Sequence, residues 1–267
     1  MSPQGYRPVD PPPGYPPEYE RDLRLRDGRT VQIRPIIPSD AWELAEAIRS
    51  ADADTLRRRF LGSPPPITPA LLTHLSTVDY RSRFALIAAD PVTGHGIAIA
   101  RYESTPQRGT AEIAVAVDPA WRRVGLATAL VELLAQAALD RDIHTFTACY
   151  LAQNRPVAAL LSLADETRQP QIKQGIAEAA IALDRDSVAA AIREVDATHA
   201  TPNHRPPADA SRGKSGAPPT AGDKDSGADG LQDPQIVASV EEVRHADRTH
   251  AAGGRGSGRF RRESRRA

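Results

Sequence analysis

The densest apolar pattern in the chain lies between residues 111 and 139. Residues 111–117 are rich in β-branched side chains and are followed by Asp118-Pro119, which predicts a buried or half-buried strand that ends there. From Gly125 onward, apolar residues recur at the spacing of one helical face, at Leu126, Leu130, Leu133, Leu134 and Ala137. We therefore predict a strand, a short basic turn and a long amphipathic helix.

The other periodic segments predict a mixed α/β sheet with helices on both faces. Alternating residues at 23–25 and 30–35 flank Asp27-Gly28, a pair typical of hairpin turns, and predict two paired strands. Ser39 is the expected cap of the first helix. The further expected elements are helices at 39–51, 52–61, 68–75 and 157–163, and strands at 83–89, 96–102, 144–151 and, as one or two strands around Gly175, 171–183. This order predicts one domain over residues 22–185.

Tails of a different composition flank that domain. Residues 1–21 are rich in proline and tyrosine, and we expect them to be extended or disordered. Residues 186–267 are mostly of low complexity and are expected to be largely disordered, with a short helix at 186–195 and a transient charged helix at 235–250. An arginine-rich stretch, residues 255–267, ends the chain.

Charge and cysteine content exclude several classes of protein. Lys plus Arg and Asp plus Glu both number 34, so no overall charge steers the chain toward nucleic acid or a membrane. Cys149, the single cysteine, excludes a disulfide framework, and scattered histidines give no metal-ligand spacing. Without a secretory signal or an apolar run long enough to cross a bilayer, we expect a soluble, cytoplasmic protein with no metal.

The turn between the strand and the long helix has the features of an anion site. A helix N-terminus offers unpaired backbone N–H groups and the positive end of the helix dipole. Gly125 permits close approach to the backbone, and Arg122 and Arg123 add positive charge. The residues therefore predict a site for a phosphate or pyrophosphate.

The pattern Arg122-x-x-Gly125-x-Ala127 resembles the Arg/Gln-x-x-Gly-x-Gly/Ala signature of the GCN5-related N-acetyltransferase (GNAT) family. The resemblance covers residues 31–184 and implies the GNAT fold. It also implies that the loop cradles the pyrophosphate of acetyl-coenzyme A (acetyl-CoA), the co-substrate. The cradle residues would be Arg122, Arg123, Val124, Gly125, Leu126, Ala127 and Thr128.

Glu112 is the candidate general base on the same strand. If the strand alternates without a bulge, Glu112 shares a face with Ala114 and Ala116, whose small side chains leave space before the carboxylate. The alternative is a strand-edge glutamate paired with an arginine. The resemblance supports the catalytic role, because many family members use a glutamate at this place. It also implies that Val115 and Val117 lend main-chain groups to the pantetheine arm of acetyl-CoA.

The second half of the resemblance departs from the family pattern. Asn154 matches the asparagine that opens the family's Asn-x-x-Ala-x-x-Leu-Tyr motif, and it either contacts pantetheine or caps its helix. The family's tyrosine, which often protonates the leaving thiolate, falls at Leu161, which cannot do so. Tyr150 is the candidate replacement, with Ser162 or water as alternatives. Cys149 is expected to be a buried residue of the core rather than an acyl-carrying nucleophile, since nothing nearby would make it a thiolate.

These residues predict an N-acetyltransferase that moves an acetyl group from acetyl-CoA to a primary amine by direct transfer in a ternary complex. The acceptor, a protein lysine or a small amine, stays open, although the lead-in helices most resemble bacterial protein-lysine acetyltransferases. The alternative is a non-catalytic acyl-CoA-binding sensor or adaptor. A third hypothesis, nucleic-acid binding through residues 255–267, predicts salt-sensitive binding, but we expect no such partner.

Overall fold

The strands form one mixed sheet in the computed structural model, which describes residues 8, 10–162, 170–199 and 236–237. The order in the sheet is β1-β2-β3-β4-β5-β6-β8-β7, with β9 paired to β5. Neighbouring strands are antiparallel except for β5 and β6, which are parallel. The strand bounds are β1 Arg21–Arg24, β2 Thr30–Pro35, β3 Arg83–Ala89, β4 Gly96–Ser104, β5 Thr110–Val117, β6 Thr145–Leu151, β7 Gln171–Lys173, β8 Ile176–Ala182 and β9 Ile236–Val237.

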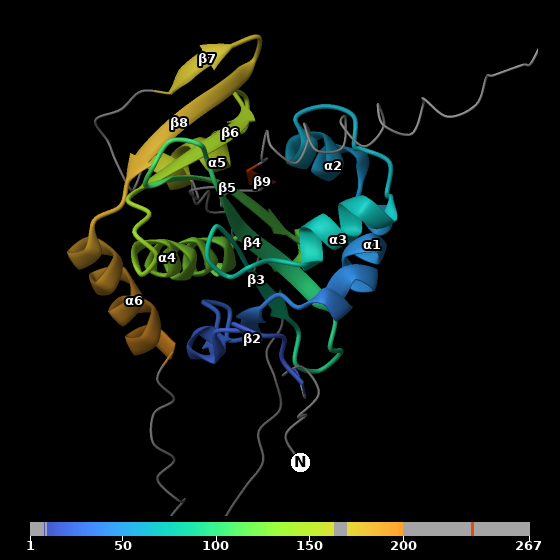
Figure 1. The fold of residues 1–267 in the computed structure, drawn as a ribbon, viewed down its shortest axis with the longest axis vertical. Coiled ribbons are helices and arrows are strands. Elements are labelled where there is room, and N and C mark those ends of the chain that lie inside the picture. The colour runs from blue at the N-terminus through green and yellow to red at the C-terminus, as the bar shows by residue number, and fades with distance from the viewer. Residues whose placement is uncertain (1–7, 9, 163–169, 200–235, 238–267) are drawn as a thin grey trace, which may run out of the picture.

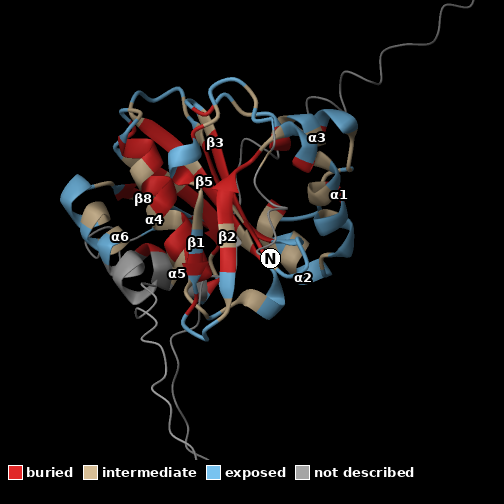
Figure 2. Ribbon diagram, turned by 90° about the horizontal axis from the view of Figure 1, so that it is seen from below, coloured by how far each residue is buried: buried red, intermediate tan, exposed pale blue. Residues whose placement is uncertain are grey.

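Helices cover both faces of the sheet, as predicted. Figures 1 and 2 show α4 and α6 on one side and α1, α2 and α3 on the other. The helix bounds are α1 Ala41–Ser50, α2 Ala53–Phe60, α3 Pro69–Ser76, α4 Leu126–Leu139, α5 Arg155–Ser162 and α6 Arg185–His199, with 3-10 turns at Pro17–Tyr19, Pro38–Asp40 and Pro119–Trp121. In the part of the chain that the structure describes, none of these helices combines the length and apolar character needed to cross a bilayer.

The main core lies between the sheet and α4. Alternate residues of β5, Ile113, Val115 and Val117, point into it and meet the apolar face of α4 that the spacing predicted. Phe84 and Tyr102 stack within it, with ring centroids 5.7 Å apart. Among the described residues, the opposite face of the sheet carries a small apolar cluster around Ile36 and Ile87. Figure 2 shows that the central strands are mostly buried.

Part of the segment predicted as a disordered tail packs onto this domain instead. Tyr19 is 3% exposed, and its hydroxyl donates to Asp140 Oδ2 at 2.9 Å. Tyr15 donates to Glu20 Oε1 at 2.8 Å and meets the ring of Tyr80 edge-on. The prediction for residues 1–21 is therefore wrong for residues 15–20, because their tyrosines supply apolar area that composition alone does not place.

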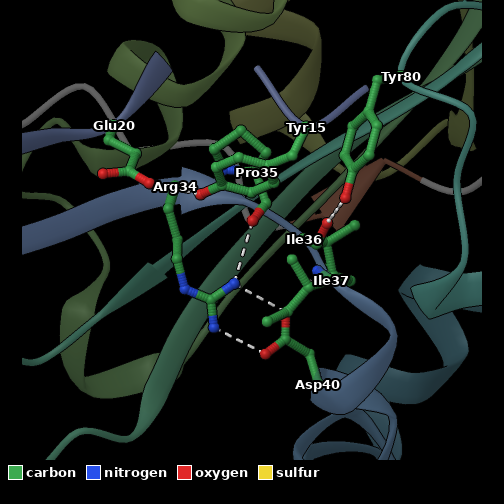
Figure 3. Close-up of polar contacts among 8 residues, drawn as sticks. All are labelled: Tyr15, Glu20, Arg34, Pro35, Ile36, Ile37, Asp40 and Tyr80. Atoms are coloured by element: carbon green, nitrogen blue, oxygen red, sulfur yellow. Dashed lines mark hydrogen bonds and ion pairs between the residues drawn. The ribbon is translucent and has the colours of Figure 1, made fainter. Parts of the chain in front are cut away.

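A buried ion pair fixes the start of α1, where Ser39 was the expected cap. Asp40 lies at the N-terminal end of α1, and its carboxylate accepts two bonds from Arg34, at 2.7 and 2.9 Å (Figure 3). The same carboxylate accepts the N–H of Ile37 at 2.8 Å. Ser39 is therefore not the cap of α1. The tie between β2 and α1 holds the helix against its face of the sheet.

The chain beyond residue 184 differs from its prediction at two places. α6 extends to His199 and packs against α4, so it is longer than the helix expected at 186–195. Residues 236–237 form strand β9, where a charged helix over 235–250 was expected. The other residues of that predicted helix, and the basic stretch 255–267, lie outside the described residues.

Candidate functional site

The sheet opens between β5 and β6 at Glu112. The parallel pairing runs from Thr110 opposite Thr145 to Glu112 opposite Thr147 and goes no further. β5 itself continues to Val117 and stays paired with β4 from Ala111 to Val117. From Ile113 onward, the edge of β5 that faces β6 is therefore not paired with β6, and Glu112 lies where the gap between the two strands begins.

Glu112 is half-buried and belongs to the face of the sheet away from α4. The β4–β5 register has no bulge, so Glu112, Ala114 and Ala116 alternate with the core residues as predicted. Two alanines beyond the carboxylate leave little side-chain bulk along that side of the gap.

Charged side chains of β3 and β4 lie next to Glu112 on this face. Glu103 is directly opposite Glu112 across the two strands. Its carboxylate contacts His74 Nε2 at 3.3 Å and Arg83 Nε at 3.7 Å. Arg101, opposite Ala114 and 2% exposed, donates from Nη1 to the carbonyl of Leu75 at 3.2 Å. We call Glu103, His74, Arg83 and Arg101 the β4 charge cluster.

The β4 charge cluster keeps Glu103 ionised. Burial by itself raises the pKa of Glu103, but the hydrogen bond from His74 and the charges of His74, Arg101 and Arg83 outweigh it, so that the pKa lies below its usual range. Sequence reasoning missed this cluster. The available signal was Arg101 and Glu103 on one face of a strand that is otherwise apolar.

The N-terminus of α4 forms the second part of the site. Gly125 precedes the helix with φ of +88°, a left-handed conformation that favours glycine. The first backbone N–H groups of α4, from Leu126 to Thr128, have no acceptor within the helix. Arg123 is exposed beside them, also with a positive φ, of 61°. Val124, between Arg123 and Gly125 in the sequence, is half-buried against the core.

The side chain of Arg122 binds β5 and α2 and does not point toward the start of α4. Its Nε donates to the carbonyl of Val117 at 3.1 Å, and its Nη2 donates to Thr55 Oγ1 of α2 at 3.1 Å. Burial lowers the pKa of Arg122, while the charge of Asp52 opposes that shift. The guanidinium thus joins the end of β5 to α2, so that only the main chain of Arg122 belongs to the turn before α4.

Arg26 is the cation that lies against the start of α4. Its backbone N–H donates to the carbonyl of Val124 at 3.2 Å. A Cβ built on Gly125 would lie 3.3 Å from Arg26 Nε, so the exposed guanidinium covers the glycine. Arg29 of the same hairpin donates to the carbonyl of Ala120 and lies over the ring of Trp121. A cation beside the positive end of a helix dipole is an arrangement that an anion would stabilise.

Comparisons with known proteins show which family the chain belongs to. Residues 52–163 match the acetyltransferase (GNAT) family. An acetyltransferase of Pseudomonas aeruginosa is 30% identical over 138 residues, which cover 51% of this chain and 74% of that protein. This chain belongs to the GNAT family. The crystal structure of the GNAT domain of S. lividans PAT shares 28% identity and a TM-score of 0.58 with it, over 63% of this chain and 99% of that domain.

The GNAT match spans α2 through α5 and contains Glu112, the turn before α4 and Asn154. It contains neither the β1–β2 hairpin that carries Arg26 nor β9. The predicted family and fold are confirmed. The roles of the individual residues remain proposals.

Tyr150, the predicted replacement for the family's tyrosine, lies on the face of the sheet that packs against the main core. Tyr150 is 2% exposed in the main core, and burial raises its pKa. Because β6 pairs with β8 without a bulge, Tyr150 shares a face with Phe146 and Ala148, the face opposite to that of Glu112 and Thr147. The structure therefore does not bring Tyr150 and Glu112 together. Leu161 is buried in the same core.

Asn154 lies directly before α5 and is 1% exposed. Its carbonyl accepts the N–H of Ala158 at 3.1 Å, which is the position of a residue that begins a helix. Cys149 is buried. Among the residues that the structure describes, no group of three or more histidine, cysteine, aspartate or glutamate side chains could hold a metal ion.

Proposed function

We propose that the protein is an acetyl-CoA-dependent N-acetyltransferase whose acceptor is a primary amine. The observation that carries the proposal is the gap between β5 and β6. The half-buried carboxylate of Glu112 lies at the position where this gap begins. Acetyl-CoA would supply an acetyl thioester, an acyl donor that needs only an unprotonated amine. The GNAT relatives favour this function over a non-catalytic acyl-CoA sensor.

Two observations support the fit of acetyl-CoA to this site. The start of α4 combines N–H groups that have no acceptor within the helix, a glycine at positive φ and the Arg26 cation, which together suit a pyrophosphate. The edge of β5 at Val115 and Ala116, which β6 does not pair, accepts an extended main chain, since β9 pairs with it. A pantetheine arm carries amide groups and could use the same main-chain groups of Val115.

Each residue then has a defined role. The main chain from Arg122 to Thr128, with the Arg26 side chain, would hold the phosphates. Val115 and Val117 would orient the pantetheine, although the carbonyl of Val117 already accepts a bond from Arg122. Asn154 would position α5 at the gap. Glu112 would take a proton from the acceptor's ammonium, directly or through a water.

The leaving thiolate needs no dedicated acid in this proposal. Tyr150 was the sequence-based candidate, but it is buried on the other face of the sheet from Glu112. The thiol of coenzyme A is acidic enough to leave as a thiolate. We therefore assign Glu112 alone as the group that moves a proton.

Calorimetry of acetyl-CoA binding tests the proposal, with Thr128→Glu as the variant. A glutamate in the first turn favours the helix dipole, so the fold should tolerate it, while its charge opposes a bound phosphate. We expect at least about tenfold weaker binding for Thr128→Glu, and nearly wild-type binding for the uncharged control Thr128→Gln. Absence of binding to the wild-type chain would overturn the proposal.

Thiol release in the presence of amines tests the reaction itself. Wild-type protein should release coenzyme A from acetyl-CoA when lysine peptides or small amines are added. Glu112→Gln should bind acetyl-CoA as the wild type does and release little thiol. Wild-type binding without amine-dependent release would favour the sensor instead.

A further inference from the structure

Strand β9 occupies the open edge of β5. Ile236–Val237 pairs antiparallel with β5, Val237 opposite Val115 and Ile236 opposite Ala116. The same two residues also lie close to β6 and α2, so that β9 sits in the gap that opens beyond Glu112 (Figure 1). A segment far along the chain thus adds a strand to the sheet at the point where β5 and β6 separate.

The gap explains why an extended segment binds there. Beyond Glu112, the main-chain groups on the β6 side of β5 have no partner from β6, although Ala114 and Val115 are 1% and 3% exposed. Buried N–H and C=O groups without hydrogen bonds are costly, and an extended backbone satisfies them in the register of a sheet. The edge therefore selects for a strand-like main chain rather than for particular side chains.

The same edge holds the pantetheine arm in the function proposed above. A strand neighbour lies about 4.8 Å away, so only one extended segment fits against a given stretch of β5. We propose that the C-terminal segment at Ile236–Val237 is an intrachain competitor of acetyl-CoA for the β5 edge at Val115 and Ala116. The competition rests on the proposed function, whereas the docking of β9 rests on its pairing alone.

The chain links β9 covalently to the domain that it docks on. Residues 200–235 lie between the end of α6 and β9 and would reach on the order of 100 Å if fully extended. Covalent linkage makes the pairing of β9 with β5 an intramolecular event, which raises the local concentration of the segment. Pairing through two residues is short, however, so a tightly bound ligand can displace it. We therefore expect a modest effect, about fivefold on the apparent affinity, as one net hydrogen bond would give.

The test uses the full chain with the double substitution Ile236→Pro/Val237→Pro. Proline has no N–H and cannot donate to a strand ladder, so β9 should no longer pair with β5. The matched control is the exchange Ile236→Val/Val237→Ile, which keeps both N–H groups and the composition. The proline chain should bind acetyl-CoA about fivefold more tightly than the wild type, measured by calorimetry, and the control should match the wild type.

Hydrogen exchange of the β5 amides provides a readout that does not depend on activity. Amides of residues 113–117 should exchange faster in the proline chain than in the wild type and the control, and added acetyl-CoA should slow them again. A peptide spanning residues 232–242, added to the proline chain, should restore protection and weaken acetyl-CoA binding. Equal exchange in all three chains would overturn the docking of β9.

Failure of the proposed function has a different signature. If the proline chain exchanges faster but no chain binds acetyl-CoA, the proposed function fails, and the competition fails with it. If exchange differs and all chains bind acetyl-CoA with equal affinity, the function stands and the competition alone is overturned.

Discussion

The two faces of the sheet differ in what covers them and in what they contain. The face toward α4 is almost entirely apolar and includes large side chains such as Phe84, Tyr102 and Phe146, each at most 1% exposed. The face toward α1, α2 and α3 has a small apolar cluster around Ile87 and, further along the strands, the β4 charge cluster and Glu112. The residues that stabilise the fold and the residues proposed for chemistry therefore lie on different faces of the sheet. One face supplies most of the buried apolar area, and the other can hold ionised groups because their partners come from α3 and β3.

The largest expected effect tests the apolar face. Phe84→Ala removes a fully buried ring that contacts Tyr19, Tyr80 and Tyr102, and should lower the free energy of unfolding by about 3–5 kcal/mol. Ile99→Ala, at a half-buried site packed against the small cluster, should cost about 1 kcal/mol. Urea unfolding followed by circular dichroism measures both. Similar losses for the two variants would contradict the difference between the faces.

The next effect tests the chemistry of the opposite face. Glu112→Gln should lower the turnover of an amine acceptor at least about a hundredfold, because a general base contributes that much or more. Stability should change by less than about 1 kcal/mol, since the side chain is half-buried and glutamine keeps its volume. Steady-state kinetics measures the turnover, and urea unfolding of the same preparations measures the stability. A variant with wild-type turnover would remove Glu112 from the mechanism.

A smaller effect concerns the charge cluster and its pH dependence. Glu103→Gln removes a carboxylate that His74 and Arg83 contact, and should cost about 1.5 kcal/mol of stability at pH 7. The pKa of Glu103 is lower in the folded chain than in the unfolded chain, so its contribution is present above the ordinary glutamate pKa of about 4.3 and is lost as the pH falls through the folded pKa. The difference between wild type and variant should therefore shrink between pH 5 and pH 3 in urea unfolding. A difference that grows on acidification would mean that Glu103 is not held ionised by its neighbours.

The smallest effect lies at the edge where α4 begins, outside both faces. Arg26→Ala should weaken acetyl-CoA binding about fivefold, because an exposed charge contributes about 1 kcal/mol at most. Arg24→Ala, at an exposed arginine in β1 ahead of the same turn, is the matched control and should leave binding unchanged. Titration calorimetry at low and at physiological salt distinguishes them, since salt should reduce the effect of Arg26. Equal affinities for wild type and Arg26→Ala would exclude the arginine from the phosphate site.

The candidate site was predictable where its parts are adjacent in sequence. Gly125 with the first turn of α4, and Glu112 two residues from Ala114, depend on spacing along one strand and one helix. The β4 charge cluster was not predictable, because His74, Arg83 and Glu103 meet only through α3 and the β3–β4 register. Arg26 lies about a hundred residues before Gly125 in the chain, and only the docking of the hairpin brings the two together.

The sequence by itself determined the β5–turn–α4 unit, the hairpin and the GNAT family, since these follow from local periodicity, turn residues and a short motif. Only the tertiary structure decided that Arg122 turns into the scaffold, that Tyr19 packs as core, and that Ile236–Val237 forms a strand on β5. The physical reason is the same in each case. A side chain or strand edge takes the partner that satisfies its hydrogen bonds or buries its apolar area, and here those partners come from distant parts of the chain.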